Sequence, residues 1–333
     1  MNGTSTQAHA REFGIIGLGK MGGNLVRQAL GAGFRVAGQT KGDPPADLPE
    51  AGLEALEDVA AFRQALQPPR LVFVWVPAGP IVDTVLDELA EALEPGDVIA
   101  DGGNSYWGDS IRRHARLRQK GIGFVDLGTS GGLAGARAGA CFMAGGDAEA
   151  VARLEPVCRA LAVEGGFVHA GGPGAGHFVK LVHNGIEFGM LQAIAEGYAL
   201  LRAQDIPLDL QGTLECWRNG SVIRSWLVDL LAEQHRADPG LARAESGYIE
   251  DTGEVNWLVM DAISMEVPVP VIAQSVMQLL ASRRAPGERD GARAVMAMRH
   301  GFGDHPFGPE ASIARERTEG RVGPLRRPGQ DRE

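Results

Sequence analysis

Hydrophobic positions in the first half of the chain follow two patterns in alternation. One is a short continuous apolar run, which is typical of a parallel strand covered on both faces. The other has the periodicity of a helix. The apolar runs lie at residues 13–16, 34–38, 71–76, 98–101 and 123–127. The helical segments lie at residues 21–31, 81–93 and 109–120. This alternation predicts a Rossmann-like, doubly wound α/β domain with a mostly parallel sheet over residues 12–176.

The pattern becomes helical after about residue 176. Residues 179–203 form one long helix-favouring stretch without proline, and shorter segments of the same kind continue to about residue 300. We expect these further helices at residues 210–217, 222–235, 256–265, 271–281 and 291–298. The pattern therefore predicts an all-α C-terminal domain over residues 177–305. Residues 1–11 and 306–333 have few apolar positions and are predicted to be a flexible leader and a flexible tail.

The composition excludes several classes of protein. The 333 residues include 42 acidic and 32 basic ones, so the net charge is −10 and no global basic field for nucleic acid exists. The chain contains no run of about 18 apolar residues, so no membrane span is expected, and residues 1–11 lack the apolar core of a secretory signal. The cysteines form no CxxC pair and no metal-ligand spacing; they are Cys141, Cys158 and Cys216. We therefore expect a cytoplasmic protein without a bound metal.

A glycine motif, Gly17-x-Gly19-x-x-Gly22, directly follows the first predicted strand and opens a predicted helix. There the first glycine permits a tight turn, the second lets the backbone approach a pyrophosphate, and the third permits close packing of helix on strand. The helix N-terminus faces the phosphates with its positive end. This context predicts a dinucleotide site, although a glycine-rich turn with a purely structural role is the alternative. The expected cofactor contacts are Gly17, Leu18, Gly19, Lys20, Met21 and Gly22.

The end of the second predicted strand bears on the choice of dinucleotide. An acidic residue about 20 positions after the glycine motif binds the ribose 2′-hydroxyl of NAD. Here the chain reads Gln39-Thr40-Lys41, and no carboxylate occurs before Asp43. Thr40 and Lys41 are suited to donate hydrogen bonds to a 2′-phosphate instead. NADP is therefore favoured over NAD, which stays open, unless Lys41 is only a solvated loop lysine.

Two further glycine-rich loops follow predicted strands, at residues 101–105 and 126–132. Ligands of doubly wound sheets bind in the crevice at the carboxyl ends of the strands. Glycines expose backbone N–H groups there, and Asn104 and Ser130 add polar donors, which suits a substrate carboxylate or hydroxyl groups. Either loop alone could be ordinary turn chemistry, but two at one edge favour a ligand site.

The long helical stretch carries four polar residues in register. Lys180, His183, Asn184 and Glu187 lie at positions i, i+3, i+4 and i+7, which form a single stripe on a helix. The opposite face is apolar. A solvated surface stripe is the alternative, but a lysine and a carboxylate kept in register on an otherwise apolar helix favour a catalytic stripe.

From about residue 13 to residue 305 the chain resembles the decarboxylating 6-phosphogluconate dehydrogenases, in their shorter bacterial form. The lysine is shared across the wider β-hydroxyacid dehydrogenase superfamily, whereas the context His183-Asn184-Gly185-Ile186-Glu187 points to the phosphogluconate branch. The motifs that carry the resemblance lie at residues 17–22, 76–79, 101–105, 130–132, 180–187 and 218–225.

The resemblance implies an oxidative decarboxylation that reduces NAD(P). Lys180 would act as general base on the C3 hydroxyl, and Glu187 as general acid that protonates C1 after CO2 has left. It also implies cofactor contacts by Val76, Pro77, Ala78 and Asn104. The substrate, a small sugar acid, would be held by Asn104, Ser130, Gly131, Gly132, His183 and Asn184.

The segment 299–305 resembles the family's Arg…His tail element, with the same six-residue spacing. The resemblance implies that Arg299 and His305 reach into a neighbouring subunit's site and contact substrate there. The chain would then be a homodimer, or a tetramer built from dimers. The alternative for Arg299 alone is a basic helix terminus.

Three departures from the family pattern concern the substrate's phosphate. Phe188 stands where the family usually has a tyrosine, Gln278 stands where an arginine is expected, and the lysine-containing phosphate loop is replaced by the acidic residues 250–254. Arg283 or Arg284 could compensate, since a dianionic phosphate needs Arg or Lys partners. One alternative is therefore a paralogue that oxidises another β-hydroxy or aldonic acid, and a less favoured one is a non-catalytic dinucleotide-binding protein.

Overall fold

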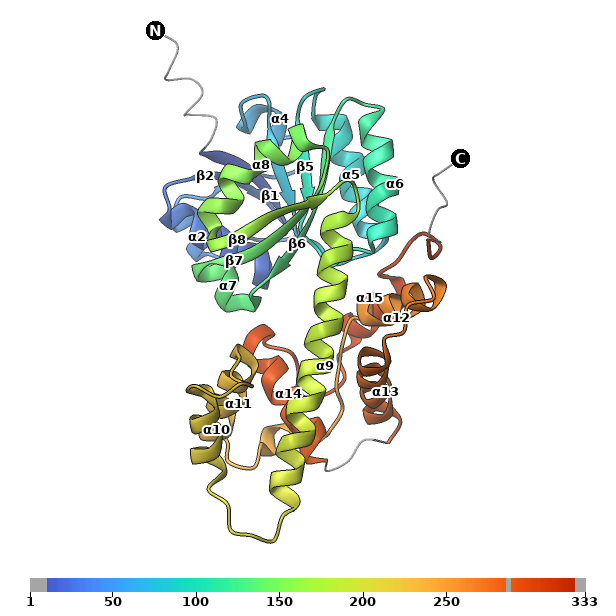
Figure 1. Cartoon of the computed structure of the whole chain (residues 1–333). Coiled ribbons are helices and arrows are strands. Elements are labelled where there is room, and N and C mark those ends of the chain that lie inside the picture. The colour runs from blue at the N-terminus through green and yellow to red at the C-terminus, as the bar shows by residue number, and fades with distance from the viewer. Residues whose placement is uncertain (1–10, 286–288, 327–333) are drawn as a thin grey trace. The chain divides into compact units, whose positions relative to one another are not determined.

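The computed structural model describes residues 11–285 and 289–326, which form two compact units (Figure 1). The first unit contains the chain up to Leu181 together with Glu319–Arg326, and the second contains Val182–Thr318. The division therefore falls five residues later than the predicted boundary. The predicted leader, apart from Arg11, lies outside the described residues.

The first unit is built on one eight-stranded sheet with the strand order β3-β2-β1-β4-β5-β6-β7-β8. Neighbouring strands are parallel throughout, except that β7 runs antiparallel to β6. The strands are β1 (Glu12–Ile16), β2 (Arg35–Gln39), β3 (Glu54–Ala55), β4 (Leu71–Val74), β5 (Val98–Asp101), β6 (Gly123–Ser130), β7 (Ala140–Gly146) and β8 (Ala162–Gly171). The predicted Rossmann-like domain is confirmed.

Helices cover both faces of this sheet (Figure 1). Phe13 and Ile15 of β1 pack in one core with α2 and α8, whereas Ile16 packs on the other face with α4 and α5. Successive residues of a strand point to opposite faces, and this is why both cores draw on the same apolar run. The helices of this unit are α2 (Lys20–Gly31), α3 (Asp47–Glu50), α4 (Phe62–Ala65), α5 (Pro80–Ala92), α6 (Trp107–Arg118), α7 (Gly132–Ala138) and α8 (Ala148–Leu161).

The second unit is helical, as predicted. Helix α9 (Ala175–Ala203) begins in the first unit, continues into the second and is 29 residues long. Its C-terminal half packs in a core that includes Leu191, Tyr198 and Leu231. The other helices are α10 (Leu210–Arg218), α11 (Trp226–Ala237), the 3₁₀ turn η1 (Ala242–Ala244), α12 (Glu254–Ser264), α13 (Pro270–Arg284), α14 (Asp290–Gly303) and α15 (Ala311–Glu319).

Two sequence expectations differ from the structure. The helix expected from residue 222 begins only at Trp226, because the Ser225 hydroxyl caps it by accepting a hydrogen bond from the Val228 N–H, and Val222 is 98% exposed. The segment expected to be a flexible tail contains α15, and residues 319–326 then pack on the first unit. No helix in the described ranges is long and apolar enough to cross a membrane.

Candidate active site

The strand order of the sheet reverses between β1 and β4: strands β2 and β3 lie on one side of β1, and β4 and β5 lie on the other. Ligands of doubly wound sheets bind at such a switch point. Gly17 follows β1 with a φ of 94°, and a Cβ there would lie 2.1 Å from the carbonyl oxygen of Trp75, directly after β4. The Gly17 N–H donates to the carbonyl of Gln39 at the end of β2. Only glycine therefore permits the three loops to meet this closely.

The start of α2 fits the pyrophosphate of a dinucleotide. A Cβ at Gly19 would meet no atom within 4 Å, so space lies open above this residue. Gly19 is the N-cap residue of α2, no side chain caps the helix, and its first turn contains no acidic residue. The first N–H groups of the helix are thus available to an anion, and Leu18, Lys20, Met21 and Gly22 lie around them.

The adenosine end of the site has no acidic residue at the end of β2. Thr40 follows β2 and is half-buried, and Lys41 is exposed. The last residue of β2 is Gln39, an amide, and its side chain donates to the Thr40 carbonyl. The position that binds a ribose 2′-hydroxyl in many NAD enzymes is therefore not carboxylate-bearing here.

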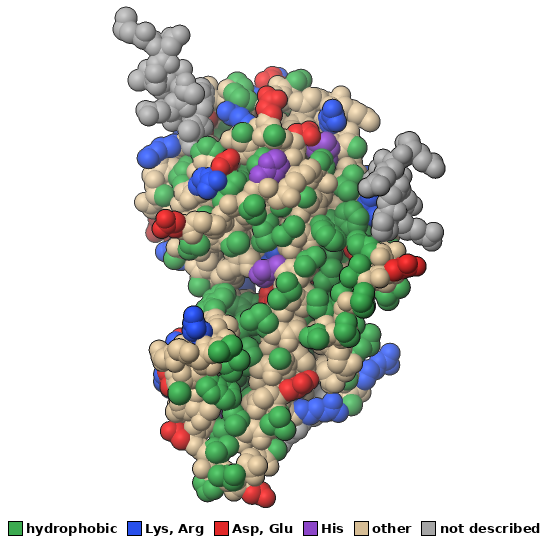
Figure 2. Space-filling model, viewed as in Figure 1, with side chains coloured by type: hydrophobic (Ala, Val, Ile, Leu, Met, Phe, Trp, Pro, Cys, Tyr) green, Lys and Arg blue, Asp and Glu red, His purple; other side chains and the backbone are tan. Residues whose placement is uncertain are grey.

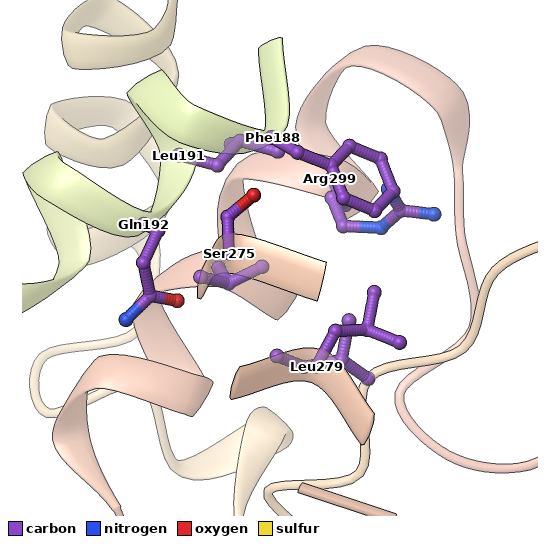
Figure 3. A pocket seen from close by; sticks show the side chains of 8 residues that line it. Phe188, Leu191, Gln192, Ser275, Leu279 and Arg299 are labelled. Atoms are coloured by element: carbon purple, nitrogen blue, oxygen red, sulfur yellow. The ribbon is translucent and has the colours of Figure 1, made fainter. Parts of the chain in front are cut away.

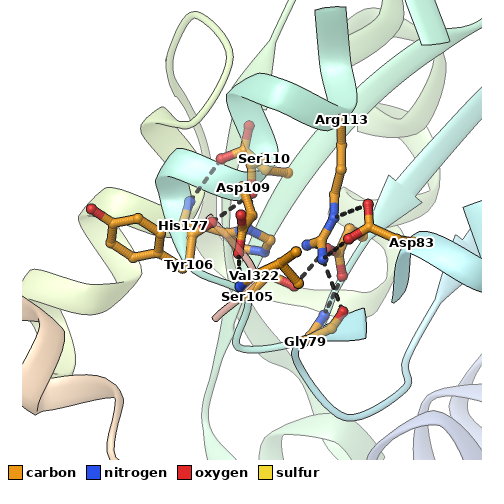
Figure 4. A network of polar contacts seen from close by, with 12 residues as sticks. Gly79, Asp83, Ser105, Tyr106, Asp109, Ser110, Arg113, His177 and Val322 are labelled. Carbon is orange, nitrogen blue, oxygen red and sulfur yellow. Dashed lines mark hydrogen bonds and ion pairs between the residues drawn. The ribbon is translucent and has the colours of Figure 1, made fainter. Parts of the chain in front are cut away.

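A buried arginine joins the loop after β4 to the loop after β5 (Figure 4). Arg113 of α6 has no exposed surface; its guanidinium donates to the Gly79 carbonyl at 3.0 Å and lies 3.5 Å from an Asp101 carboxylate oxygen. It also donates to Asp83. Asp101 in turn accepts from the Ser105 hydroxyl at 2.7 Å. The network therefore links the loop after β4, which contains Val76, Pro77 and Ala78, to the loop after β5, in which Asn104 is exposed.

The first turn of α9 packs directly on β6 and β7. The Asp126 carboxylate accepts hydrogen bonds from the backbone N–H groups of Gly174 and His177, at 2.7 and 2.8 Å. Asp126 has no exposed surface, and this burial raises the pKa of its carboxyl group. A Cβ at Gly176 would lie 2.2 Å from the Asp126 carbonyl oxygen, so helix and strand are in backbone contact.

Lys180 lies one turn further along α9, against the same strand. A Cβ at Gly128 of β6 would lie 2.6 Å from the Lys180 Cβ, and only 8% of Lys180 is exposed. Residues i and i+2 of a strand share a face, so Gly128 and Ser130 lie on one face of β6. The structure therefore brings Lys180 to the face of β6 that leads to Ser130, Gly131 and Gly132.

The other three residues of the stripe belong to the second unit. The His183 Nδ1 and Asn184 Oδ1 atoms are 3.1 Å apart, and the Asn184 amide lies 3.5 Å from a carboxylate oxygen of Glu254 in α12. Glu187 follows on the same face of α9. Since a helix rises 1.5 Å per residue, Lys180 and Glu187 are about 10 Å apart along one continuous helix.

Burial along α9 is the reverse of that in a solvated polar stripe. Lys180 and Asn184 are buried, whereas Val179, Ile186 and Met190 on the apolar side are exposed, Ile186 to 54%. Figure 2 shows many hydrophobic side chains on the surface of the second unit. Two buried polar residues on one side and exposed apolar residues on another suit a site on one side of the helix and a contact surface on the other.

Comparisons with known proteins agree with this geometry. The model for the NAD binding domain of 6-phosphogluconate dehydrogenase matches residues 12–171, and the model for the C-terminal domain of that enzyme matches residues 176–305. The Bacillus subtilis protein YqeC, provisionally named a 6-phosphogluconate dehydrogenase, is 41% identical over 295 residues, which cover 88% of this chain and 98% of YqeC. The chain belongs to the 6-phosphogluconate dehydrogenase family.

Two more relatives widen the comparison within the 6-phosphogluconate dehydrogenase family. The NAD(+)-dependent, decarboxylating 6-phosphogluconate dehydrogenase of Haloferax volcanii is 38% identical over 88% of this chain and 97% of its own length. A solved structure of Plasmodium falciparum 6-phosphogluconate dehydrogenase, described in apo form and with NADP+ and 6-phosphogluconate, has a TM-score of 0.75 at 27% identity and covers 82% of this chain and 62% of that one. Membership confirms the prediction of an NAD(P)-dependent oxidoreductase.

Arg299, expected to serve a neighbouring subunit, lies inside its own unit (Figure 3). Only 5% of it is exposed; its guanidinium donates to the Glu250 carbonyl at 2.9 Å and lies 5.3 Å from the centre of the Phe188 ring. Arg299 and Phe188 border a cavity of about 10 Å³, room for one water at most. His305 is half-buried, and its ring packs against Phe302. Arg299 thus contacts Phe188, the residue that follows Glu187, and its role in a neighbouring subunit's site stays a prediction.

The arginines considered as phosphate partners differ in their availability. Arg283 is paired with Asp251 and also donates to the Ile249 carbonyl at 2.9 Å. Arg284 is exposed, as is Gln278. The acidic loop thus neutralises one of the two candidate cations, and Arg317 of α15 is bound to the same loop through Glu250.

The sequence patterns did not single out Glu254, which contacts Asn184 of the predicted stripe. Its carboxylate accepts from Thr252 and lies near the Asn184 amide, and burial, together with the charge of Asp251, raises the pKa of Glu254. The signal was present in the acidic loop, but helical spacing on α9 could not reveal a partner 70 residues away.

Proposed function

We propose that the chain catalyses the oxidative decarboxylation of 6-phospho-D-gluconate to D-ribulose 5-phosphate and CO2, with reduction of NAD(P). The observation that carries the proposal is the placement of Lys180 and Glu187 on one face of α9, whose first turns pack on β6. Membership of the 6-phosphogluconate dehydrogenase family supports the reaction class.

Lys180 is proposed as the general base. Its neutral amine would accept the proton of the C3 hydroxyl while hydride leaves C3, and the bound dinucleotide supplies the hydride acceptor. Gly128 beneath its Cβ and the Asp126 cap of α9 limit how the lysine moves. A base positioned in this way contributes about 10²- to 10⁴-fold in rate.

Glu187 is proposed as the general acid of the second half of the reaction. The C1–C2 bond of the 3-keto acid breaks, C1 leaves as CO2, and the electron pair passes to the ketone oxygen, which takes a proton back from Lys180 to give an enediol. The Glu187 carboxyl would then protonate the former C2, which is C1 of the product, while the enediol hydroxyl returns its proton to Lys180, and the ketose forms. The substrate contacts proposed around the two groups are Asn104, Ser130, Gly131, Gly132, His183 and Asn184.

NADP is proposed as the preferred cofactor. The support comes from this chain: Thr40 and Lys41 occupy the end of β2, where no carboxylate would repel a 2′-phosphate. The Haloferax volcanii relative is named as NAD(+)-dependent, so NAD use is the competing outcome.

A second candidate substrate is an aldonic acid without the phosphate. The specific observation in its favour is that Arg283 is already paired with Asp251, while Phe188 offers no hydroxyl to an anion. A phosphate dianion would then gain fewer charge-assisted hydrogen bonds than it usually does.

Steady-state kinetics with 6-phosphogluconate and gluconate, each with NAD and NADP, test these proposals. The main proposal expects the highest kcat/KM for 6-phosphogluconate with NADP, measured at 340 nm, and formation of ribulose 5-phosphate and CO2. Preference for gluconate would support the second candidate. Tight dinucleotide binding without turnover of any aldonic acid would contradict both.

A homodimer is proposed as the assembly, with a tetramer built from two dimers as the larger alternative. The support is the exposed apolar set on α9, α12 and α13, which includes Ile186, Ile263 and Val271. Light scattering on Ile263→Glu, with Val168→Glu as an exposed control in the first unit, tests it. The proposal expects monomers for the first variant only, and an unaltered mass for both would contradict it.

A further inference from the structure

We propose that the C-terminal segment, residues 319–326, is a positioning element for the two loops that bind the dinucleotide. The inference rests on the proposed function, because it assigns cofactor binding to residues 76–79 and Asn104. It goes beyond that function, because the segment lies outside the parts of the chain that the family models match, residues 12–171 and 176–305. The segment nevertheless belongs to the first unit.

A buried carboxylate anchors the centre of the segment. Asp109 of α6 is 1% exposed, and it accepts hydrogen bonds from the backbone N–H groups of Val322 and Gly323 at 2.8 and 2.7 Å (Figure 4). Hydrogen bonds to a charged acceptor are stronger than those between neutral groups. A Cβ at Gly323 would lie 2.8 Å from the same carboxylate, so this position has no room for a side chain.

Two aromatic residues before Asp109 contact the segment as well. The Arg326 N–H lies 3.1 Å from the Tyr106 hydroxyl, which accepts its hydrogen bond. The Arg321 guanidinium lies 5.7 Å from the centre of the Tyr106 ring, and that of Arg326 lies 5.9 Å from the Trp107 ring. Tyr106 is two residues after Asn104, so these contacts hold the end of the Asn104 loop.

The segment also contacts the loop after β4. Gly79 has a φ of 107°, and a Cβ there would lie 2.3 Å from the Glu319 carbonyl oxygen. The Gly79 carbonyl meanwhile accepts the hydrogen bond from buried Arg113. Gly79 is therefore held from two directions, by α6 through Arg113 and by the C-terminal segment through Glu319.

These contacts give the segment a thermodynamic role in cofactor binding. Loops that are restrained in their bound conformation bind a ligand without a further ordering cost. The apparent Kd is inversely proportional to the fraction of molecules whose loops are in the binding conformation. If release of the segment lowers that fraction to between a tenth and a third, the Kd for the dinucleotide rises about threefold to tenfold.

Gly323→Val is the primary test, because its side chain cannot fit against Asp109. Asp109→Asn is the second variant, which keeps the shape of the anchor and removes its charge. Gly31→Val, at the exposed end of α2 where a Cβ meets no atom within 4 Å, is the matched control. Hydrogen exchange of the full chain without cofactor is measured, together with the Kd for NADP+ and for NAD+.

We expect both test variants to exchange faster at residues 322–326, at 78–79 and at 105–107, and to bind dinucleotide about threefold to tenfold more weakly. The control should match the unaltered protein in every measurement. The proposal is overturned if the segment is released while the Kd and the exchange of both loops stay unchanged. It is overturned as well if neither variant releases the segment.

This outcome is separable from that of the proposed function. If the unaltered protein binds neither dinucleotide, the proposed function fails, and the exchange of the two loops in the cofactor-free protein still decides whether the segment orders them.

Discussion

The two ends of the site-bearing part of α9 are held in different ways. At the Lys180 end, a Cβ at Gly176 would meet the backbone of β6 and β7, and a Cβ at Gly128 would meet Lys180 itself. At the Glu187 end, a Cβ at Gly185 would lie 2.3 Å from a Leu258 methyl carbon, the far end of a flexible side chain. One end is fixed by backbone contact, whereas the other is packed among side chains that can adjust.

The difference teaches how the proposed base and acid keep their spacing. The sheet packs against Lys180, and Glu187 follows about 10 Å further along the same helix. Changes at the Lys180 end should therefore have larger effects than matched changes at the Glu187 end.

The largest effect is expected for Lys180→Met. Loss of the base should lower kcat by about 10²- to 10⁴-fold and leave the Kd for dinucleotide nearly unchanged. Lys120→Met, which removes an exposed lysine paired with Glu91, is the control and should keep full activity. Turnover within tenfold of the unaltered protein would assign the base to another group.

A smaller loss is expected for Glu187→Gln. Without the acid, the enediol should accumulate because its protonation is slow. We therefore expect kcat to fall by about 10²-fold, while the first turnover still reduces the cofactor. Stopped-flow absorbance at 340 nm would detect this as a burst. Glu196→Gln, on the same helix but exposed, is the matched control; absence of the burst would place Glu187 in the oxidation step instead.

The comparison of the two ends is tested directly by Gly176→Ala and Gly185→Ala. The first methyl group meets carbonyl oxygens and cannot be accommodated without moving α9, so we expect about 1–3 kcal/mol of destabilisation and a loss of activity. The second meets a movable leucine and should cost less. Calorimetric unfolding with kcat for both variants checks the order, and equal losses would remove the distinction between the ends.

The smallest effect concerns pH and the second unit. Burial, with the charge of Arg202 as a second cause, lowers the pKa of His235 below its usual value of 6.5. The unfolded chain therefore takes up a proton before the folded one, and stability should fall as the pH drops through about 6.5. Thermal unfolding of the protein and of His235→Gln at pH 7.5 and 5.5 should show a weaker pH dependence in the variant. An identical dependence would exclude His235 as its source.

Local patterns predicted much of the fold correctly. The Gly17 motif lies where it was expected because strand, turn and helix are consecutive in the chain, and the helical spacing of Lys180, His183, Asn184 and Glu187 holds because α9 is continuous. The predicted start of α11, at residue 222, was wrong because a single capping serine, Ser225, outweighs the apolar residues before it. Helix α15 and residues 319–326 lie where a flexible tail was expected, because the few apolar positions there do not reveal an anchor such as Asp109. Residues 327–333 of that expected tail lie outside the described residues.

By itself, the sequence determined which residues share a strand end or a helix face, since those relations depend on backbone periodicity over a few residues. Only the tertiary structure decided what each face meets. It turned the polar side of α9 inward and left Ile186 exposed, paired Arg283 with Asp251, buried Arg299 against Phe188, and brought Gly323 to Asp109 across more than 200 residues. Such contacts arise from packing between distant segments, and no local pattern of residues encodes them.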